Sequence, residues 1–265
     1  MTARNLRTAN HRVLACGYVG KTESEHQRTP LLAFESLICV HHRLITAILS
    51  ENNPSAEPRP PFGEEVANSV SHGAGLLAAF VAGPLLIARA VDTDRAWGVF
   101  GASVFAASIV AMYLTSTLYH AFPQGRGKRL FRTLEHCAIF VLIAGTYTPV
   151  TLIAIRGAWG WTLFGLVWCL ATVGILLNSV TSTKHRWLPG VLYLALAWLI
   201  IFAIRPLSLS VPFAGLMWLL GGGLAYTVGM AFFAARGVPY CHFVWHLFVL
   251  AGTTCHFIAV WFYVV

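Results

Sequence analysis

The sequence has little charge. Asp, Glu, Lys and Arg make up 11% of the 265 residues, whereas hydrophobic residues make up 57%. A soluble domain usually carries about 25% charged residues, which keep its surface in water. The composition therefore excludes an ordinary soluble domain and indicates a protein embedded in a membrane.

Long polar connections between the apolar runs are also missing. A helix needs about 20 mostly apolar residues to cross the roughly 30 Å hydrocarbon layer. Seven such segments are expected, at about 66–88, 97–120, 133–155, 161–180, 187–204, 212–235 and 242–265. They are too long for the strands of a membrane barrel and lack period-two alternation. The sequence therefore predicts an all-α integral membrane protein with a bundle of seven transmembrane helices.

Basic residues are shared unequally between the two sides that these spans define. The loops after the second, fourth and sixth spans hold Arg126, Lys128, Arg129, Arg132, Lys184, Arg186 and Arg236. The loops on the opposite side hold only Arg89, Arg95, Arg156 and Arg205. Because short cytoplasmic loops are enriched in Lys and Arg, we expect a cytoplasmic N-terminus and a C-terminus outside. Topology, with contact to anionic membrane lipids, explains the net charge of +8, and no nucleic-acid partner is expected.

The first 65 residues differ in kind from the rest. They are polar, end in the proline-rich stretch PSAEPRPP (54–61), and lack the charged start and clean apolar run of a signal peptide. The stretch 31–50 is too polar to span, and both a disordered tail and an interfacial amphipathic helix fit it. We therefore divide the chain into a polar N-terminal tail, 1–65, and a seven-span membrane domain, 66–265.

Polar and ionisable residues inside the expected spans gather near one face of the membrane. Such residues are costly in lipid and by default mark a functional site. They are Asn68 and His72 in the first span, Ser116 and His120 at the end of the second, Glu135 at the start of the third, and His242, His246 and the deeper His256 in the seventh. Because successive spans alternate in direction, all of them except His256 are expected at the cytoplasmic side. The sequence therefore predicts one site built from four spans.

The spacing of the histidines indicates a metal. His242 and His246 are four residues apart and share one helical face, as the paired histidines of HExxH proteases do. A third imidazole, from His120, would complete the three-ligand arrangement of catalytic zinc. Zn, Cu, Fe and Ni all accept imidazole, and we take tetrahedral zinc as the working interpretation.

Three of these residues also have plainer interpretations. Glu135 fits an interfacial charge beside Arg132, and Ser116 fits a hydroxyl bonded to the carbonyl four residues back. His256 lies about 15 Å along the helix from His246, too far to share an ion, so we expect it to make a core hydrogen bond.

Four segments carry a resemblance to a known family. They are EVANSVSHG (65–73), STLYHAF (116–122), RTLEHCAIFVLIAGTYTPV (132–150) and HFVWHLFVLAGTTCHF (242–257). They resemble the hemolysin III family, the bacterial branch of the progestin and adipoQ receptor (PAQR) proteins, in a superfamily shared with the alkaline ceramidases. The resemblance covers about 66–265. It implies seven spans in a bacterial plasma membrane, a cytoplasmic N-terminus, and a zinc ion bound by His120, His242 and His246.

The resemblance also implies roles for the residues around the zinc. Glu135 falls on the acidic residue that holds the zinc-bound water, although this chain has Glu in LEH where the family pattern has Asp in LDH. We expect the extra methylene to change the catalytic geometry more than it changes metal binding. Ser116 and His120 match the family's S-x-x-x-H pattern. The family's E-x-x-N-x-x-x-H pattern matches Glu65, Asn68 and His72, for which we expect a structural role or one in support of the ligands.

Three functions remain open. The first, which we favour, is a zinc-dependent hydrolase that cleaves an amide or ester bond of a membrane lipid, with Glu135 activating water and Ser116 donating to the oxyanion. The second is a cytolytic pore, which needs a polar path through the full membrane, whereas the polar residues here lie toward one side. The third is a receptor or lipid sensor with structural zinc. Neither the lipid nor the oligomeric state follows from the sequence.

Overall fold

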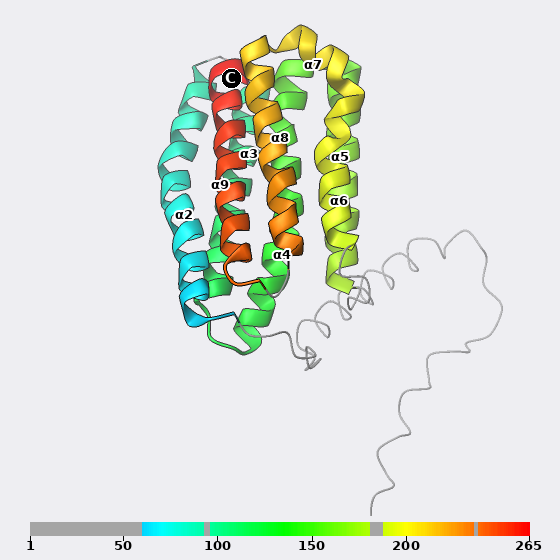
Figure 1. Ribbon diagram of the computed structural model, residues 1–265. Coiled ribbons are helices and arrows are strands. Elements are labelled where there is room, and N and C mark those ends of the chain that lie inside the picture. The colour runs from blue at the N-terminus through cyan, green and yellow to red at the C-terminus, as the bar shows by residue number, and fades with distance from the viewer. Residues whose placement is uncertain (1–59, 93–95, 181–187, 236–237) are drawn as a thin grey trace, which may run out of the picture. The chain divides into compact units, whose positions relative to one another are not determined.

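The computed structural model describes residues 60–92, 96–180, 188–235 and 238–265, and every regular element in these ranges is a helix. Seven helical stretches there are long and apolar enough to cross a membrane (Figure 1). The predicted seven-helix membrane class is therefore confirmed. Of the tail expected at 1–65, only the last six residues are described, and the helix considered for 31–50 lies outside the described part.

Each span is one helix or a run of consecutive helical segments. The spans are α2 (Phe62–Val91), α3 (Ala96–Ala121), α4 with the π-helix η1 (Arg126–Pro149 and Val150–Ile155), α5 (Gly157–Val180), α6 with the 3₁₀-helix η2 and α7 (Leu188–Ala197, Trp198–Ala203 and Ile204–Ser210), α8 (Phe213–Ala234), and α9 with the π-helix η3 (Cys241–Ala259 and Val260–Val264). A helix satisfies its own backbone hydrogen bonds, which lipid cannot do, so apolar runs of this length fold as helices.

Two expected boundaries are wrong by six residues or more. α4 begins at Arg126 and not near 133, because the basic residues before 133 continue the helix beyond the apolar run, and Lys and Arg are good helix formers. The fifth span ends at Ser210 and not near 204. Pro206 lies in the first turn of α7, where the missing N–H of proline removes no helical hydrogen bond.

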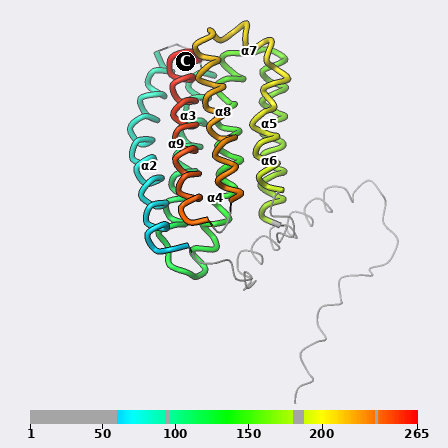
Figure 2. The backbone as a smooth tube through the Cα atoms, viewed as in Figure 1, coloured from blue at the N-terminus to red at the C-terminus, as the bar shows by residue number. Residues whose placement is uncertain are grey.

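The packing of the helices brings distant parts of the chain to one end. α2 packs against α3, α3 against α4, and α8 against α9, which returns to α2 (Figure 2). α4 with η1 is the most buried of the seven spans. α2, α4 and α9 begin, and α3 ends, at the lower end of Figure 1, whereas the C-terminus lies at the upper end. Four helix ends that carry polar residues therefore meet at one end of the bundle.

Candidate metal centre

Three imidazoles and one carboxylate meet at this end of the bundle. They belong to His120 at the end of α3, Glu135 near the start of α4, and His242 and His246 in the first turns of α9. One possible ligand atom from each lies within 4.8 Å of all the others. We call these four residues the His/Glu cluster, and its members are those that the sequence predicted to meet.

The distances between the ring nitrogens fit a metal ion. Nε2 of His242 lies 3.2 Å from Nε2 of His120 and 3.1 Å from Nε2 of His246. Nitrogens bound to zinc at 2.0–2.1 Å in a tetrahedron are about 3.3 Å apart, so these rings already have nearly the spacing of ligands. Oε1 of Glu135 lies farther out, 3.7 Å from Nε2 of His120 and 3.9 Å from Nε2 of His246. The cluster could hold a metal ion through its three imidazoles.

The outer ring nitrogens of two ligands are held by other groups. Nδ1 of His120 lies 2.7 Å from Oε2 of Glu65. Nδ1 of His246 lies 3.2 Å from the backbone oxygen of Asn68 and 3.3 Å from the hydroxyl of Ser71. Such partners leave Nε2 of each ring free to face the centre of the cluster, as is usual for metal-bound histidine.

Ser116 holds the carboxylate of the cluster. Its hydroxyl donates a 2.6 Å hydrogen bond to Oε1 of Glu135, and both side chains are buried. The alternative bond from Ser116 to the carbonyl four residues back is not among the hydrogen bonds of the described residues. Glu135 is buried inside the bundle and is not the exposed interfacial charge that its place beside Arg132 allowed. Ser116 and Glu135 thus form one unit next to the imidazoles.

Asn68 and His72 lie beside the cluster, as expected for supporting residues. Besides its backbone contact with His246, Asn68 places its side-chain Nδ2 3.5 Å from Nδ1 of His120. The ring of His72 is fully buried and stacks on the ring of His246, with 3.8 Å between centroids and 3° between planes. α2 therefore supplies a surface against which two of the imidazoles rest.

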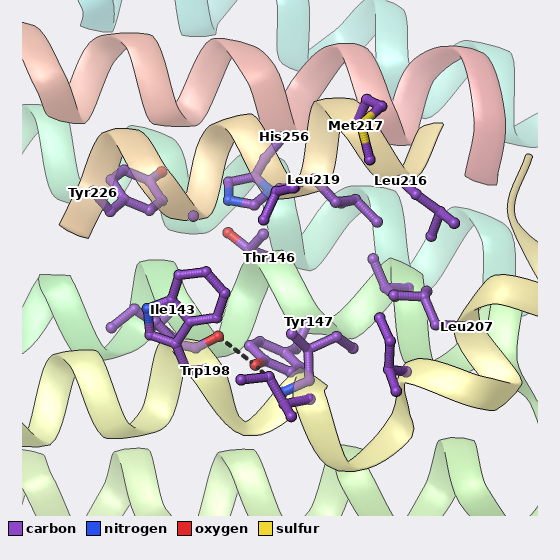
Figure 3. Close-up of a pocket in the computed structure, with 17 residues that line it drawn as sticks. Ile143, Thr146, Tyr147, Trp198, Leu207, Leu216, Met217, Leu219, Tyr226 and His256 are labelled. Carbon is purple, nitrogen blue, oxygen red and sulfur yellow. Dashed lines mark hydrogen bonds between the residues drawn. The ribbon is translucent and has the colours of Figure 1, made fainter. Parts of the chain in front are cut away.

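His256 lies apart from the cluster, as its spacing predicted, but the expected core hydrogen bond is not seen at Nδ1. Among the described residues this buried nitrogen has no hydrogen-bond partner. The ring packs against Gly222 and stacks on the ring of Tyr226 at 5.5 Å, so packing with neighbouring groups holds it in place. His256 also lines a cavity (Figure 3).

That cavity, which we call the large cavity, has a volume of about 250 Å³ and an almost wholly apolar wall. Its wall includes Ile143 and Tyr147 of α4, Trp198 of η2 and Leu219 of α8 (Figure 3). Ile201, also in its wall, is 54% exposed, so the cavity reaches the outer surface of the bundle. This surface belongs to spanning helices and therefore faces lipid.

A second cavity of about 30 Å³ lies beside the large cavity, on the side nearer to the His/Glu cluster. It shares Ile143 and Tyr226 with the large cavity. It is also lined by Met112, one helical turn before Ser116, and by Trp245, next to His246. The two cavities thus follow each other along the bundle toward the cluster.

Glu65, which the family pattern matched, contacts the cluster, whereas its partner Lys128 was not among the predicted site residues. Glu65 accepts a hydrogen bond from Lys128, with 2.8 Å between Nζ and Oε1, in addition to its contact with His120. Helical spacing agrees with that pattern, because Glu65 precedes Asn68 by three residues and His72 by seven and so shares their helical face. Lys128 has no such signal, since it lies in a basic stretch that indicates only the topology.

A helical bundle of seven apolar spans, with a buried His/Glu cluster at one end, defines a multi-pass membrane protein with a potential metal centre. The sequence model of a family described as haemolysin-III related matches residues 62–257. The chain belongs to this family, as its four segments predicted. A bacterial plasma membrane is consistent with this membership.

Curated relatives agree with the family match. The chain is 40% identical over 201 residues to Hemolysin-3 of Bacillus cereus, which covers 76% of this chain and 92% of that protein. It is 39% identical over 202 residues to the Hemolysin-3 homolog of Bacillus subtilis (strain 168), covering 76% and 95%. It is 26% identical over 213 residues to the monocyte to macrophage differentiation factor of Homo sapiens, covering 77% and 86%. The matched lengths of 201 to 213 residues are close to the length of the seven-span region.

Proposed function

We propose that the protein is a zinc-dependent hydrolase that cleaves an amide or ester bond of a membrane lipid near the cytoplasmic face. The observation that carries the proposal is the His/Glu cluster, in which three imidazoles have the spacing of metal ligands while a buried carboxylate stands slightly farther away. Three protein ligands and one open position are typical of catalytic zinc, whereas structural zinc sites are usually closed by four.

Zinc in this position would supply a Lewis acid that makes water nucleophilic near neutral pH and polarises a carbonyl. Glu135 is the general base: its carboxylate accepts the proton of the attacking water and passes it to the leaving group. Ser116 donates its hydroxyl proton to Oε1 of Glu135, which orients the carboxylate. To stabilise an oxyanion as well, Ser116 would have to turn its hydroxyl away from Glu135, so orientation of the base is its first role.

The apolar cavities support a lipid as the substrate. A hydrolase of soluble substrates has no use for an apolar cavity at the lipid-facing surface with a second apolar cavity beside it that lies nearer to the reactive groups. A chain of CH₂ groups entering the large cavity near Ile201 would gain about 0.8 kcal/mol per buried CH₂ relative to water, although much less relative to lipid. The cavity therefore contributes chiefly by orienting the chain, with the bond to be cleaved near the cluster.

The relatives' name Hemolysin-3 suggests a pore, but a pore has less support than a hydrolase in this structure. The buried middle of the bundle is filled by large side chains such as Leu86, Phe105 and Phe140, each at most 1% exposed. Within the described residues of one chain, the buried histidines and carboxylates of the cluster and its supports lie toward one end only. A polar path through the full thickness is therefore not formed by these residues.

The test separates binding of zinc from chemistry. Glu135→Gln keeps the size of the side chain and removes the base, so we expect about one zinc per purified chain, as in the wild type, and hydrolysis slower by roughly 10²–10⁴-fold. Glu135→Asp keeps a carboxylate and restores the residue expected from the family pattern, and it should retain substantial activity. Release of fatty acid from a panel of ceramides and glycerolipids in mixed micelles is the activity measured.

Two results would contradict the proposal in different ways. A Glu135→Gln protein that hydrolyses lipid as fast as the wild type would rule out the mechanism. Loss of zinc from that variant would make Glu135 a fourth ligand, and the site would then be closed and structural, as in the receptor or sensor alternative.

A further inference from the structure

Glu65 and Lys128 take no part in the proposed reaction, yet they form a buried charged pair directly against the His/Glu cluster. The two oxygens of the Glu65 carboxylate have different partners: Oε2 lies 2.7 Å from Nδ1 of His120, and Oε1 accepts a 2.8 Å hydrogen bond from Nζ of Lys128. The side chains of Glu65, Lys128 and His120 are only 16%, 9% and 3% exposed. The pair joins α2, α3 and α4 at the cluster.

Lys128 has further contacts that fix its position. Its ammonium group lies 4.9 Å from the centre of the Tyr119 ring, and it approaches the backbone oxygen of Phe122 at 3.4 Å. A buried ammonium is stable only where its charge is paired, so Lys128 stays with Glu65 and prevents that carboxylate from turning elsewhere.

The contact with Glu65 decides which nitrogen of His120 is available to a metal. A neutral imidazole carries one N–H, and a carboxylate can only accept, so the proton of His120 lies on Nδ1. Nε2 then keeps its lone pair, and it is Nε2 that lies 3.2 Å from Nε2 of His242 inside the cluster. A carboxylate partner also makes the imidazole a stronger electron donor to a metal.

His246 provides an internal comparison. Its Nδ1 faces the neutral backbone oxygen of Asn68 and the hydroxyl of Ser71. Among the described residues, the carboxylate support of an outer ring nitrogen is therefore seen at His120 and not at His246. The two ligands should respond differently when a charge near α2 is removed.

We propose that Glu65, held in place by Lys128, is a positioning residue that fixes the tautomer and orientation of His120 and so sets the affinity of the cluster for its metal. This rests on the metal centre of the proposed function but not on the hydrolysis. The plain alternative is an ion pair that only ties α2 to α4. The two differ in what they predict for metal binding by folded protein.

The experiment measures zinc binding by the full chain in detergent, by competition with a chromophoric chelator, together with the visible absorption of the Co²⁺-loaded protein and the midpoint of thermal unfolding without metal. Glu65→Gln removes the charge and keeps the shape. We expect zinc affinity to fall by roughly 10–100-fold, as for other supporting carboxylates of metal-bound histidine, and the Co²⁺ spectrum to change. Glu65→Asp, which keeps the charge, should bind zinc more tightly than Glu65→Gln.

Matched controls are available on both helices. Glu64→Gln removes the same charge from a buried neighbour that has no ion pair or hydrogen bond with the cluster in the described structure, and zinc affinity should stay at the wild-type value. Lys128→Met should weaken zinc binding, by less than Glu65→Gln, and Lys128→Arg should restore it. Arg126→Met removes a positive charge from an exposed position in the same turn and should change nothing.

The possible outcomes distinguish positioning from structure. If the wild type binds zinc and Glu65→Gln binds it as tightly as Glu64→Gln does, the positioning role is wrong and the ion pair is structural. An unfolding midpoint that falls while zinc affinity is unchanged would also mean that the ion pair is structural. If the wild type takes up neither Zn²⁺ nor Co²⁺, the metal centre fails, and this inference with it.

Discussion

A histidine ring can serve a metal only when one nitrogen is free of its proton and points at the ion. His242 shows how closely this condition is met, because its Nε2 lies within 3.2 Å of two other ring nitrogens. Nitrogen lone pairs that face one another at this distance repel unless a proton or a cation lies between them. The approach of His120 at the end of α3 to His242 in α9 thus creates a position that favours a cation.

Removal of one imidazole should therefore empty the centre. In His242→Ala two imidazoles remain, which are too few to hold zinc against water, and we expect the zinc content to fall from about one per chain to near zero. His136→Ala is the control, because His136 follows Glu135 directly but lies outside the cluster, with Nδ1 2.8 Å from the backbone oxygen of Arg132. Elemental analysis of purified protein gives the zinc content. Full occupancy in His242→Ala would mean that the ligands are assigned wrongly.

The residues of the cluster could be predicted from the sequence, because a histidine or glutamate inside an apolar run is costly and its helical spacing reveals its neighbours. The contacts of Glu65 with His120 and Lys128 could not be predicted. Spacing gives the face of a helix but not how far a side chain reaches, and Lys128 comes to Glu65 only because α2 and α4 both pack against α3. Likewise the stacking of His72 on His246 depends on how α2 rests on α9, which periodicity does not contain.

Among the elements, α4 is the central helix and packs against α3, α5 and α6. It is the most buried span, and small residues let its neighbours approach closely. A Cβ atom added to Gly101 of α3 would lie only 3.0 Å from Cα of Pro149. Beyond Pro149 the chain continues as the π-helix η1, where the hydroxyl of Thr151 donates to the backbone oxygen of Tyr147 at 2.9 Å. Proline inside a membrane helix is tolerated when local adjustments and hydroxyl groups satisfy the backbone in this way.

Gly101→Ala should therefore destabilise the bundle. The new methyl group meets backbone atoms that cannot turn away, so α3 and α4 must separate, at a cost of about 1–3 kcal/mol. Gly165→Ala adds the same methyl group to α5, where a Cβ has nothing within 4 Å, and should leave stability unchanged or raise it by up to about 1 kcal/mol. Thermal unfolding in detergent compares the two. Equal midpoints would show that the contact of Gly101 with Pro149 does not limit the packing.

At the scale of the whole molecule, the distribution of basic residues indicates which side of the membrane the His/Glu cluster faces. The His/Glu cluster lies at the end of the bundle where α2, α4 and α9 begin, and the basic residues in the first turns of α4 lie at that end as well. Lys and Arg in short loops favour the cytoplasm, so we propose that the cluster opens toward the cytoplasmic face and that the C-terminus lies outside. The substrate bond would then be approached from the inner leaflet.

Reporter fusions test this orientation. A reporter that is active only in the cytoplasm should be silent when fused to Val265 and active when inserted after Gln124, in the loop before α4. The basic residues that follow this loop at the start of α4 are the physical reason, since moving several positive charges across the membrane is opposed. Equal amounts of the two fusion proteins on an immunoblot serve as the control. A strong signal from the fusion at Val265 would reverse the orientation.

The place of His242 and His246 in the last span has a consequence for biogenesis. When a ribosome has completed the first six spans and these have inserted, the nascent chain contains Glu135 and only one of the three imidazoles. The centre can form only after α9 has entered the bilayer and packed against α2 and α8. In the proposed centre, metal loading would thus be a late event that reports a finished seventh span, and a product truncated before Cys241 would not acquire the ion however well its other helices assemble.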